Sequence, residues 1–372
     1  MIVTQIGNLF DSNAGTLVNT VNCVGVMGKG IAEEFKKRFP DYYEDYRARC
    51  HAGQMKLGEP YLYKDLLGAS IISFPTKEHW RSPARLEDIV NGLDYFAEHY
   101  KEWGVIDVAF PPLGCGNGGL DWAIVGPIIY QKLRSLELKV HLFAPYGASR
   151  EHISTEFLER PVSLADVRGK QQRGVQPSWL ALLDVVDKLA KQPYANPVGR
   201  TLFQKIAFIL TEQGVDTGFK FQQGSYGPFS NELKQAIHAF ANSNLIEEKR
   251  LGRMNAISIG PAFTKLRKQH EKSIVPYDRK IARTVDLLSR IKGTEQAEEV
   301  ATVLYASRKL KRDREGTAVS EDDLFNYILG WKRTWDREDK KRALASSIRH
   351  LEMLGWLRLE YSESLPVDEE AA

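Results

Sequence analysis

The sequence predicts an α/β domain followed by a mainly helical region, and two observations support this. Residues 1–147 alternate short β-rich runs with helical patterns, which is typical of a layered α/β domain. Helical patterns dominate from residue 179 onward, and the stretch before it is polar and lacks periodic apolar residues. We therefore expect a first domain over 1–150, a linker over 151–178 and a helical region over 179–372.

The elements of the first domain follow from hydrophobic spacing and from β-branched content. Expected strands cover residues 2–6, 16–21, 61–63, 69–74, 105–110 and 139–143. Expected helices cover residues 31–39, 41–50, 86–103 and 122–136. Because strands and helices alternate, the loops that join them are expected to carry the functional site.

The helical region contains an internal repeat. Expected helices cover residues 179–191, 199–213, 231–241, 278–291, 295–310, 321–331 and 340–354. Residues 231–248 and 342–360 align at a constant offset, and each segment reads as an amphipathic helix, a short turn and a strand. This pattern is typical of a winged-helix unit, with a wing tip at 249–254, and two such units would fill the region. Ordinary core packing of amphipathic helices would produce the same spacing.

Composition indicates a globular protein. Hydrophobic residues make up 43% of the chain and charged residues 27%, and no apolar run approaches the ~18 to 20 residues of a membrane span. The first residues lack the basic and apolar segments of a signal peptide, so a cytoplasmic protein without membrane contact is expected. Cys23, Cys50 and Cys115 have no CxxC spacing, which argues against a disulfide framework and a zinc site. We expect neither a metal nor a cofactor.

The first candidate site is VNTVNCVGVMGKGIAEEF, residues 18–35, in which an expected strand leads through Gly25, Gly28 and Gly30 into an expected helix. Glycines let a backbone approach a phosphate closely, and a helix N-terminus offers unpaired N–H groups and a positive dipole end. The order of the glycines matches neither GxGxxG nor the P-loop lysine motif. The segment therefore suits a diphosphate, although a plain strand-to-helix turn would have the same composition.

A second glycine loop, PPLGCGNGGLDW at residues 111–122, follows an apolar run and opens the helix expected at residue 122. Together, the Asn19 and Asn22 pair, the GVMGKGIA loop and the GCGNGG loop resemble the macrodomain family. The resemblance covers residues 1 to about 150 and implies an ADP-ribose-binding, three-layer α/β/α fold with a mixed sheet. Within the family, the motifs are similar to the DarG branch of DNA ADP-ribosyl glycohydrolases, which are antitoxins of DarT toxins.

The resemblance implies which residues hold ADP-ribose. Asn22 would contact the distal ribose, with Asn19 supporting the turn below it, and the two glycine loops would enclose the diphosphate and the distal ribose from opposite sides. The implied binding set is Asn8, Asn19, Asn22, Met27, Gly28, Lys29, Gly30, Ile31, Gly114, Cys115, Gly116, Asn117, Gly118, Gly119 and Tyr146.

Three positions of the site need comment. Asn8 stands where many macrodomains place an Asp that accepts from the adenine amino group, and an Asn can accept there without bringing charge. Tyr146 either flanks the adenine or proximal ribose or caps the fold. Gly118 stands where related protein-directed hydrolases carry an Asp, so activity on carboxylate-linked ADP-ribose is not expected. Asp121 is expected to cap the following helix instead.

Lys77 in SFPTKEHWR stands after the expected strand 69–74, where this branch carries its catalytic lysine. Cleavage of an N-glycosidic bond builds oxocarbenium character on the ribose and requires protonation of the departing base. A partly neutral lysine can attack the anomeric carbon, whereas an ammonium can protonate the base. The sequence leaves both roles open.

The three residues after Glu78 suit a nucleobase. Trp80 offers a ring on which an extruded base can stack, Arg81 can pair with a phosphate, and His79 lies beside them. The alternative is that Trp80 packs against the domain surface.

The resemblance also implies a function for the whole chain. It implies removal of ADP-ribose from nucleobases, with thymidine expected, in single-stranded DNA, and neutralisation of the cognate DarT toxin by residues 179–372. The basic run at 308–315 suits a solvated helix end as well as DNA contact. The alternatives are a non-catalytic ADP-ribose reader, a protein ADP-ribosyl hydrolase with a winged-helix DNA-binding tail, and a winged-helix regulator that senses ADP-ribose.

Overall fold

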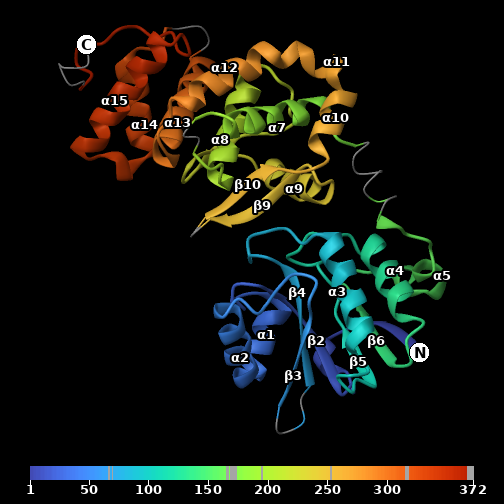
Figure 1. Ribbon diagram of the computed structural model, residues 1–372. Coiled ribbons are helices and arrows are strands. Elements are labelled where there is room, and N and C mark those ends of the chain that lie inside the picture. Colours follow the sequence, from blue (N-terminus) through green and yellow to red (C-terminus); the bar gives the residue numbers. More distant parts are fainter. Residues whose placement is uncertain are drawn as a thin grey trace. The chain divides into compact units, whose positions relative to one another are not determined.

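A computed structural model gives the fold of the chain (Figure 1). It describes residues 1–65, 68, 70–164, 167, 174–193, 196–251, 254–314 and 318–366. The chain divides into two compact units: Met1–Gly174 grouped with His238–Ser243, and Val175–Ile237 grouped with Asn244 onward. Within the described ranges, no helix has the length and apolar character needed to cross a membrane.

The first unit is built on a mixed sheet of six strands among the residues that the structure describes. The strands are β1 (Ile2–Ile6), β2 (Thr16–Asn22), β3 (Tyr61–Lys64), β4 (Ser70–Lys77), β5 (Asp107–Phe110) and β6 (Lys139–Ala144). Their order across the sheet is β1-β6-β5-β2-β4-β3, with β3 antiparallel to β4 and the other neighbours parallel. The expectation of an α/β fold with a mixed sheet is therefore confirmed.

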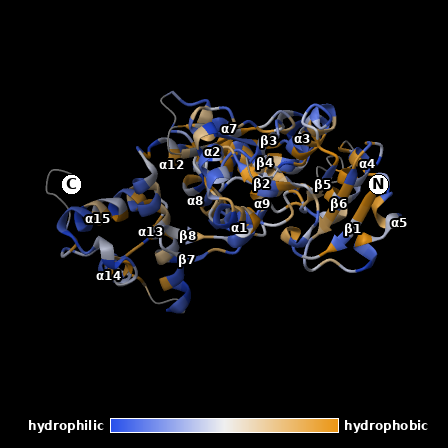
Figure 2. Ribbon diagram, turned by 90° about the horizontal axis from the view of Figure 1, so that it is seen from below, coloured by the Kyte–Doolittle hydropathy of each residue, from blue (hydrophilic) through white to orange (hydrophobic). Residues whose placement is uncertain are grey.

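Helices cover both faces of this sheet. The helices of the first unit are α1 (Gly30–Arg38), α2 (Pro40–His51), α3 (Leu86–His99), α4 (Trp122–Leu133) and α5 (Thr155–Leu158). Figure 1 shows α1 and α2 on one face and α3 and α4 on the other. Phe35, Tyr42 and Tyr46 lie in one core and Phe96 and Ile129 in the other, and each is fully or almost fully buried. In Figure 2 the inner strands β5 and β6 carry hydrophobic residues, as strands buried on both faces should.

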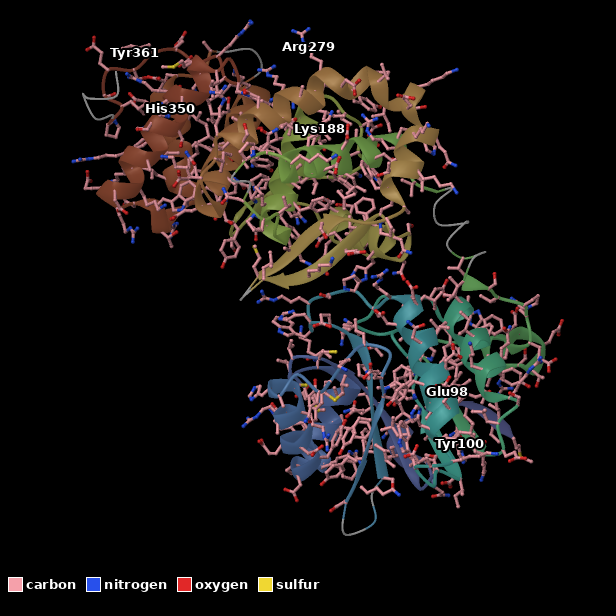
Figure 3. All side chains as sticks on the ribbon, in the orientation of Figure 1. Glu98, Tyr100, Lys188, Arg279, His350 and Tyr361 are labelled. Atoms are coloured by element: carbon pink, nitrogen blue, oxygen red, sulfur yellow. The ribbon has the colours of Figure 1, made fainter. Side chains whose placement is uncertain are left out.

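Local chemistry fixes the ends of these helices. Pro40 begins α2 in the first turn, where a missing N–H is tolerated. Asp121 caps α4 by accepting from the Ala123 N–H at 2.9 Å, which confirms the capping role expected from the sequence. Near the end of α3, Glu98 is exposed whereas Tyr100 is 4% exposed and packs in the core (Figure 3).

The expectation of a linker over 151–178 is wrong for the first part of that segment. Helix α5 lies within it, and Phe157 and Leu158 are only 2% and 1% exposed because they pack into the core beside α4. Four helical residues are too few to give a periodic signal, so composition alone suggested a linker. Residues 165, 166 and 168–173, at the centre of the expected linker, lie outside the described residues.

The second unit is mainly helical, as expected. Apart from the last residues of α9, which are grouped with the first unit, its helices are α7 (Pro177–Ala190), α8 (Arg200–Glu212), α9 (Asn231–Asn242), α10 (Phe263–Gln269), α11 (Glu271–Ile274), α12 (Asp278–Ser289), α13 (Thr294–Asp313), α14 (Glu321–Trp331) and α15 (Glu338–Met353). Two antiparallel hairpins accompany them, β7 (Gln222–Gly224) with β8 (Gly227–Phe229) and β9 (Ile246–Leu251) with β10 (Met254–Ile259). Figure 3 labels Lys188 on α7, Arg279 on α12 and His350 on α15.

The helix and the turn of the internal repeat recur in the structure, whereas the strand expected after the turn forms only in the first segment, as β9, and residues 356–359 of the second segment form none. Helices α9 and α15 bury the aligned pairs Leu233 and Leu344, Ile237 and Ile348, and Phe240 and Leu351. At the aligned position after each helix, the backbone is left-handed, with a φ of 56° at Asn244 and 69° at Gly355. Asn and Gly adopt this conformation at the least cost, which explains why the sequence places them there.

Candidate active site

Lys77 is the last residue of β4, so the strand continues three residues beyond its expected end at 74. β2 and β4 pair in parallel up to Val21 and Pro75, and the register then slips so that Asn22 pairs with Lys77. The Cys23 N–H donates to the Lys77 carbonyl at 3.1 Å. The backbone of Lys77 is therefore held by the sheet and does not belong to a free loop.

The Lys77 side chain reaches the second glycine loop. Its ammonium donates a hydrogen bond to the carbonyl oxygen of Asn117. The Asn117 amide nitrogen in turn lies beside Gly30 of the first loop, 3.5 Å from where a Cβ on Gly30 would stand. Lys77 and the two glycine loops therefore meet around Asn117.

Asn22 braces the first glycine loop from within. Its Nδ2 donates to the Val26 carbonyl at 2.6 Å, and its Oδ1 accepts from the N–H groups of Val24 and Val26 at 3.0 and 3.3 Å. The Tyr46 hydroxyl donates to the Asn22 carbonyl at 2.7 Å. The side chain is thus occupied in shaping the loop, and its expected contact with a ribose stays a prediction.

A buried polar chain lies beneath the same loop. The Asn19 Nδ2 donates to the Tyr42 hydroxyl at 3.1 Å, and this hydroxyl shares a 2.6 Å hydrogen bond with Ser73. Met27 is 3% exposed and packs in the core, with its sulfur 3.8 Å from the Asn19 amide. Met27 can therefore line the ligand only with its backbone, whereas Gly28, Lys29 and Gly30 are exposed.

The second glycine loop is folded tightly on itself. Gly114 has a φ of 71°, and its carbonyl accepts from the Leu120 N–H at 3.0 Å. A Cβ on Gly118 would lie 2.2 Å from this carbonyl oxygen, which no side chain can occupy. The loop conformation is the physical reason why Gly118 carries no acid.

Cys115, in the same loop, is not poised as a nucleophile. Burial raises the pKa of its thiol to about 12, and the charge of Asp121 adds to this effect. A thiol that stays protonated near neutral pH is a weak nucleophile.

Two further residues of the implied binding set, Asn8 and Tyr146, lie outside the two glycine loops. The Asn8 Oδ1 accepts from the Phe10 N–H at 3.3 Å and caps the short turn Leu9–Asp11. The side-chain oxygen of Asn8 therefore already accepts a hydrogen bond within that turn. Tyr146 follows β6 and is 77% exposed, so its ring is available to a ligand.

The side chains that follow Glu78 lie against one another at the surface. The Arg81 guanidinium lies 4.4 Å from the Trp80 ring centre, and the His79 ring centre lies 5.3 Å from that of Trp80. The Arg81 N–H donates to His79 Nδ1 at 3.2 Å. With 45% of Trp80 exposed, the ring is not packed into the domain, and the cation beside it leaves aromatic surface open to a flat partner.

The sequence did not single out an acidic group that lies near this segment. Asp88 stands in the first turn of α3, and burial raises the pKa of its carboxyl from the ordinary 3.8 to about 6. The Arg85 guanidinium opposes the shift, while the charges of Glu87 and Glu78 add to it. The position of Asp88 in the helical pattern of the sequence does not indicate that its carboxyl is desolvated.

This shift predicts a pH dependence of stability. The folded state binds the Asp88 proton more tightly than the unfolded state, so the free energy of unfolding decreases as pH rises from about 4 to about 6. Asp88→Asn removes this cost and should gain up to about 3 kcal/mol over wild type between pH 4 and pH 7. Urea unfolding at four pH values measures the gain, with Glu98→Gln as an exposed control on the same helix. A difference between Asp88→Asn and wild type that does not change with pH would contradict the prediction.

The described residues contain no group of three His, Cys, Asp or Glu side chains arranged to hold a metal ion. The arrangement is instead one of backbone amides, a lysine and an aromatic surface. Such a set can receive a diphosphate at the N-terminus of α1 and present an ammonium to the group attached to it.

Comparisons with known proteins agree with this geometry. Residues 18–129 match the family model described as Macro domain. The DNA ADP-ribosyl glycohydrolase of Thermus aquaticus is 36% identical over 235 residues, which cover 62% of this chain and 61% of that protein. A DNA ADP-ribosyl transferase-DNA ADP-ribosyl glycohydrolase fusion protein of Thermosipho africanus is 39% identical over 157 residues, which cover 37% of this chain and 40% of that protein.

A solved structure, the macrodomain of Thermus aquaticus DarG, is 43% identical and matches 39% of this chain and 99% of its own, with a TM-score of 0.38. The chain spans about three fifths of the length of the full Thermus aquaticus relative. The family model lies within the first unit, and the longer match continues into the second. Residues 18–129 therefore match the macrodomain family, and over a longer stretch the chain is similar to proteins named as DNA ADP-ribosyl glycohydrolases.

Proposed function

We propose that the first unit binds ADP-ribose between the two glycine loops and hydrolyses the N-glycosidic bond that joins it to a base in single-stranded DNA. The observation that carries the proposal is the Lys77 ammonium on the Asn117 carbonyl, at the meeting point of both loops. A lysine held there stands next to the position where the distal ribose of a bound ADP-ribose would end. The relatives named as DNA ADP-ribosyl glycohydrolases support the same reaction.

The residues divide the chemistry between them. Exposed backbone at Gly28 and Gly30 and the first turn of α1 would bind the diphosphate, since the helix dipole and free N–H groups favour negative charge. Lys77 would act on the anomeric centre, either by attacking it or by donating a proton to the departing base. Gly118 leaves no room for the acid of the protein-directed hydrolases.

A nucleobase is the leaving group that this surface suits. Trp80 offers an exposed face for stacking, and Arg81 lies beside it to pair with a phosphate. We propose thymidine as the modified nucleoside, by resemblance to the DarG branch.

The test is release of ADP-ribose by the purified full chain. An ADP-ribosylated single-stranded oligonucleotide should be converted to the unmodified oligonucleotide, followed by mass spectrometry. A protein carrying ADP-ribose on carboxylates, offered at the same concentration, should be hydrolysed far more slowly. Tight ADP-ribose binding with no turnover on either substrate would instead identify a reader.

We also propose that the second unit contains two winged-helix-like units. The first would comprise α7, α8, α9 and the β9–β10 hairpin, with the β7–β8 hairpin inserted between α8 and α9. An isolated β-bridge joins Gly199, before α8, to Ala256 of β10, at the place of the first strand of a winged helix. The second would comprise α13, α14 and α15, with Ser320 bridging Glu360. Part of the expected wing tip at 249–254, residues 252 and 253, lies outside the described residues.

We propose that residues 179–372 bind and neutralise a cognate DarT-type ADP-ribosyltransferase toxin. Support comes from the Thermosipho africanus relative, which is named as a fusion of a transferase and a glycohydrolase. The full chain carrying Lys77→Ala should still bind the toxin in calorimetry and reduce its modification of DNA. Loss of both effects in this variant would assign neutralisation to hydrolysis alone.

A further inference from the structure

The slip between β2 and β4 is the feature that decides where the Lys77 side chain points. Side chains alternate between the two faces of a strand, so one extra residue turns everything after it to the opposite face. Here the extra residue is Thr76, because Val21 pairs with Pro75 and Asn22 pairs with Lys77. Without the slip, Lys77 would occupy the register of a residue beyond Asn22 and face the other side of the sheet.

The slip is closed by one side-chain hydrogen bond. The Thr76 hydroxyl donates to the Val21 carbonyl at 3.3 Å, and Thr76 is 4% exposed. Bulges leave ladder groups unpaired, and a buried carbonyl without a partner is costly. Pro75, directly before, has no N–H to offer the ladder. The threonine hydroxyl thus supplies a donor on the strand segment where the backbone lacks one.

We propose that Thr76 is a positioning residue for Lys77. Its hydroxyl holds the extra residue in place, and the slip so fixed directs the Lys77 ammonium onto the Asn117 carbonyl of the second glycine loop. The inference rests on the proposed function in assigning the reaction to Lys77. The Thr76 hydroxyl donates to Val21 of β2, whereas the hydrogen bonds that brace the first glycine loop come from Asn22 and Tyr46.

The test compares Thr76→Val with Thr76→Ser in the full chain. Valine keeps the branched shape and removes the donor, whereas serine keeps the donor. Thr76→Val should lower kcat for ADP-ribosylated single-stranded DNA by about 10- to 100-fold, because a small misplacement of a catalytic group is enough to do so. The Kd for ADP-ribose should change by less than about threefold, and Thr76→Ser should restore most of kcat. Thr76→Ala replaces Thr76→Val if the latter melts far below wild type.

Two results would overturn the inference. One is a wild-type kcat in both Thr76→Val and Thr76→Ala. The other is a loss of kcat in Thr76→Ser as large as in Thr76→Val. An NMR measurement distinguishes failure of the Thr76 inference from failure of the proposed function. The Lys77 signal of ¹⁵N-lysine-labelled protein, assigned with Lys77→Arg, should shift in Thr76→Val and not in Thr76→Ser, even if the wild-type chain releases no ADP-ribose.

Discussion

Lys77→Ala should reduce kcat for release of ADP-ribose from modified single-stranded DNA by about 1,000-fold, while the Kd for ADP-ribose changes by less than about threefold. The split follows from the geometry. The Lys77 ammonium contacts the protein at the Asn117 carbonyl, which is a backbone group that the variant leaves in place. The surfaces expected to hold the diphosphate, α1 and the glycine loops, keep their own hydrogen bonds. Stopped assays give kcat, and calorimetry gives Kd.

The two roles open to Lys77 predict different results for Lys77→Arg. Arginine keeps the positive charge and the donor but stays protonated, so it cannot attack the anomeric carbon. Partial activity in Lys77→Arg would favour proton donation, and no activity together with borohydride trapping of the wild type would favour attack. Lys56→Ala is the matched control, because Lys56 is an exposed lysine of the same unit that pairs with Glu59. Wild-type kcat in Lys77→Ala would exclude both roles.

Elements with strong local signals could be predicted from the sequence, and short or non-local ones could not. The six strands of the first unit and the long helices of both units appear within a few residues of their expected positions, whereas the strand expected after Gly355 is not formed by residues 356–359. β4 ends later than expected because its last residues depend on the slipped pairing with β2, which no local pattern reports. α5 and the hairpin β7–β8 are too short to produce periodicity, so the burial of Phe157 was not foreseen.

The site divides in the same way. The motifs that carry the site could be located from the sequence, but the meeting of Lys77 with the second glycine loop could not, because β4 and β5 pair with opposite edges of β2 and only the sheet order brings their ends together. That the Asn22 side chain hydrogen-bonds within the protein could not be anticipated. One of its partners is Tyr46, which lies on α2 and is distant in the sequence. Met27 looked like a lining residue because it stands among glycines, yet its apolar side chain is buried at 3% exposure.

The second glycine loop yields the other large effect. Gly118→Ala places a methyl group 2.2 Å from the Gly114 carbonyl oxygen, so the loop must open and break the hydrogen bond from Leu120. Overpacking of this kind costs about 1 to 3 kcal/mol, which corresponds to a fall of roughly 2 to 12 °C in Tm for a domain of this size. The Kd for ADP-ribose should rise by at least about 10-fold, because the loop that we propose covers the diphosphate is displaced. Calorimetry and thermal unfolding measure both effects.

The control for this variant is Gly147→Ala, since a Cβ on Gly147 meets nothing within 4 Å and its φ is not left-handed. It should unfold at the wild-type Tm. Gly118→Asp restores the acid of the protein-directed hydrolases in sequence, but the same clash applies to its Cβ, so it should lose ADP-ribose binding and gain no activity on carboxylate-linked ADP-ribose. If Gly118→Asp instead hydrolyses such a substrate, the loop can adopt a second conformation, and the absence of an acid at this position is a matter of substrate choice and not of space.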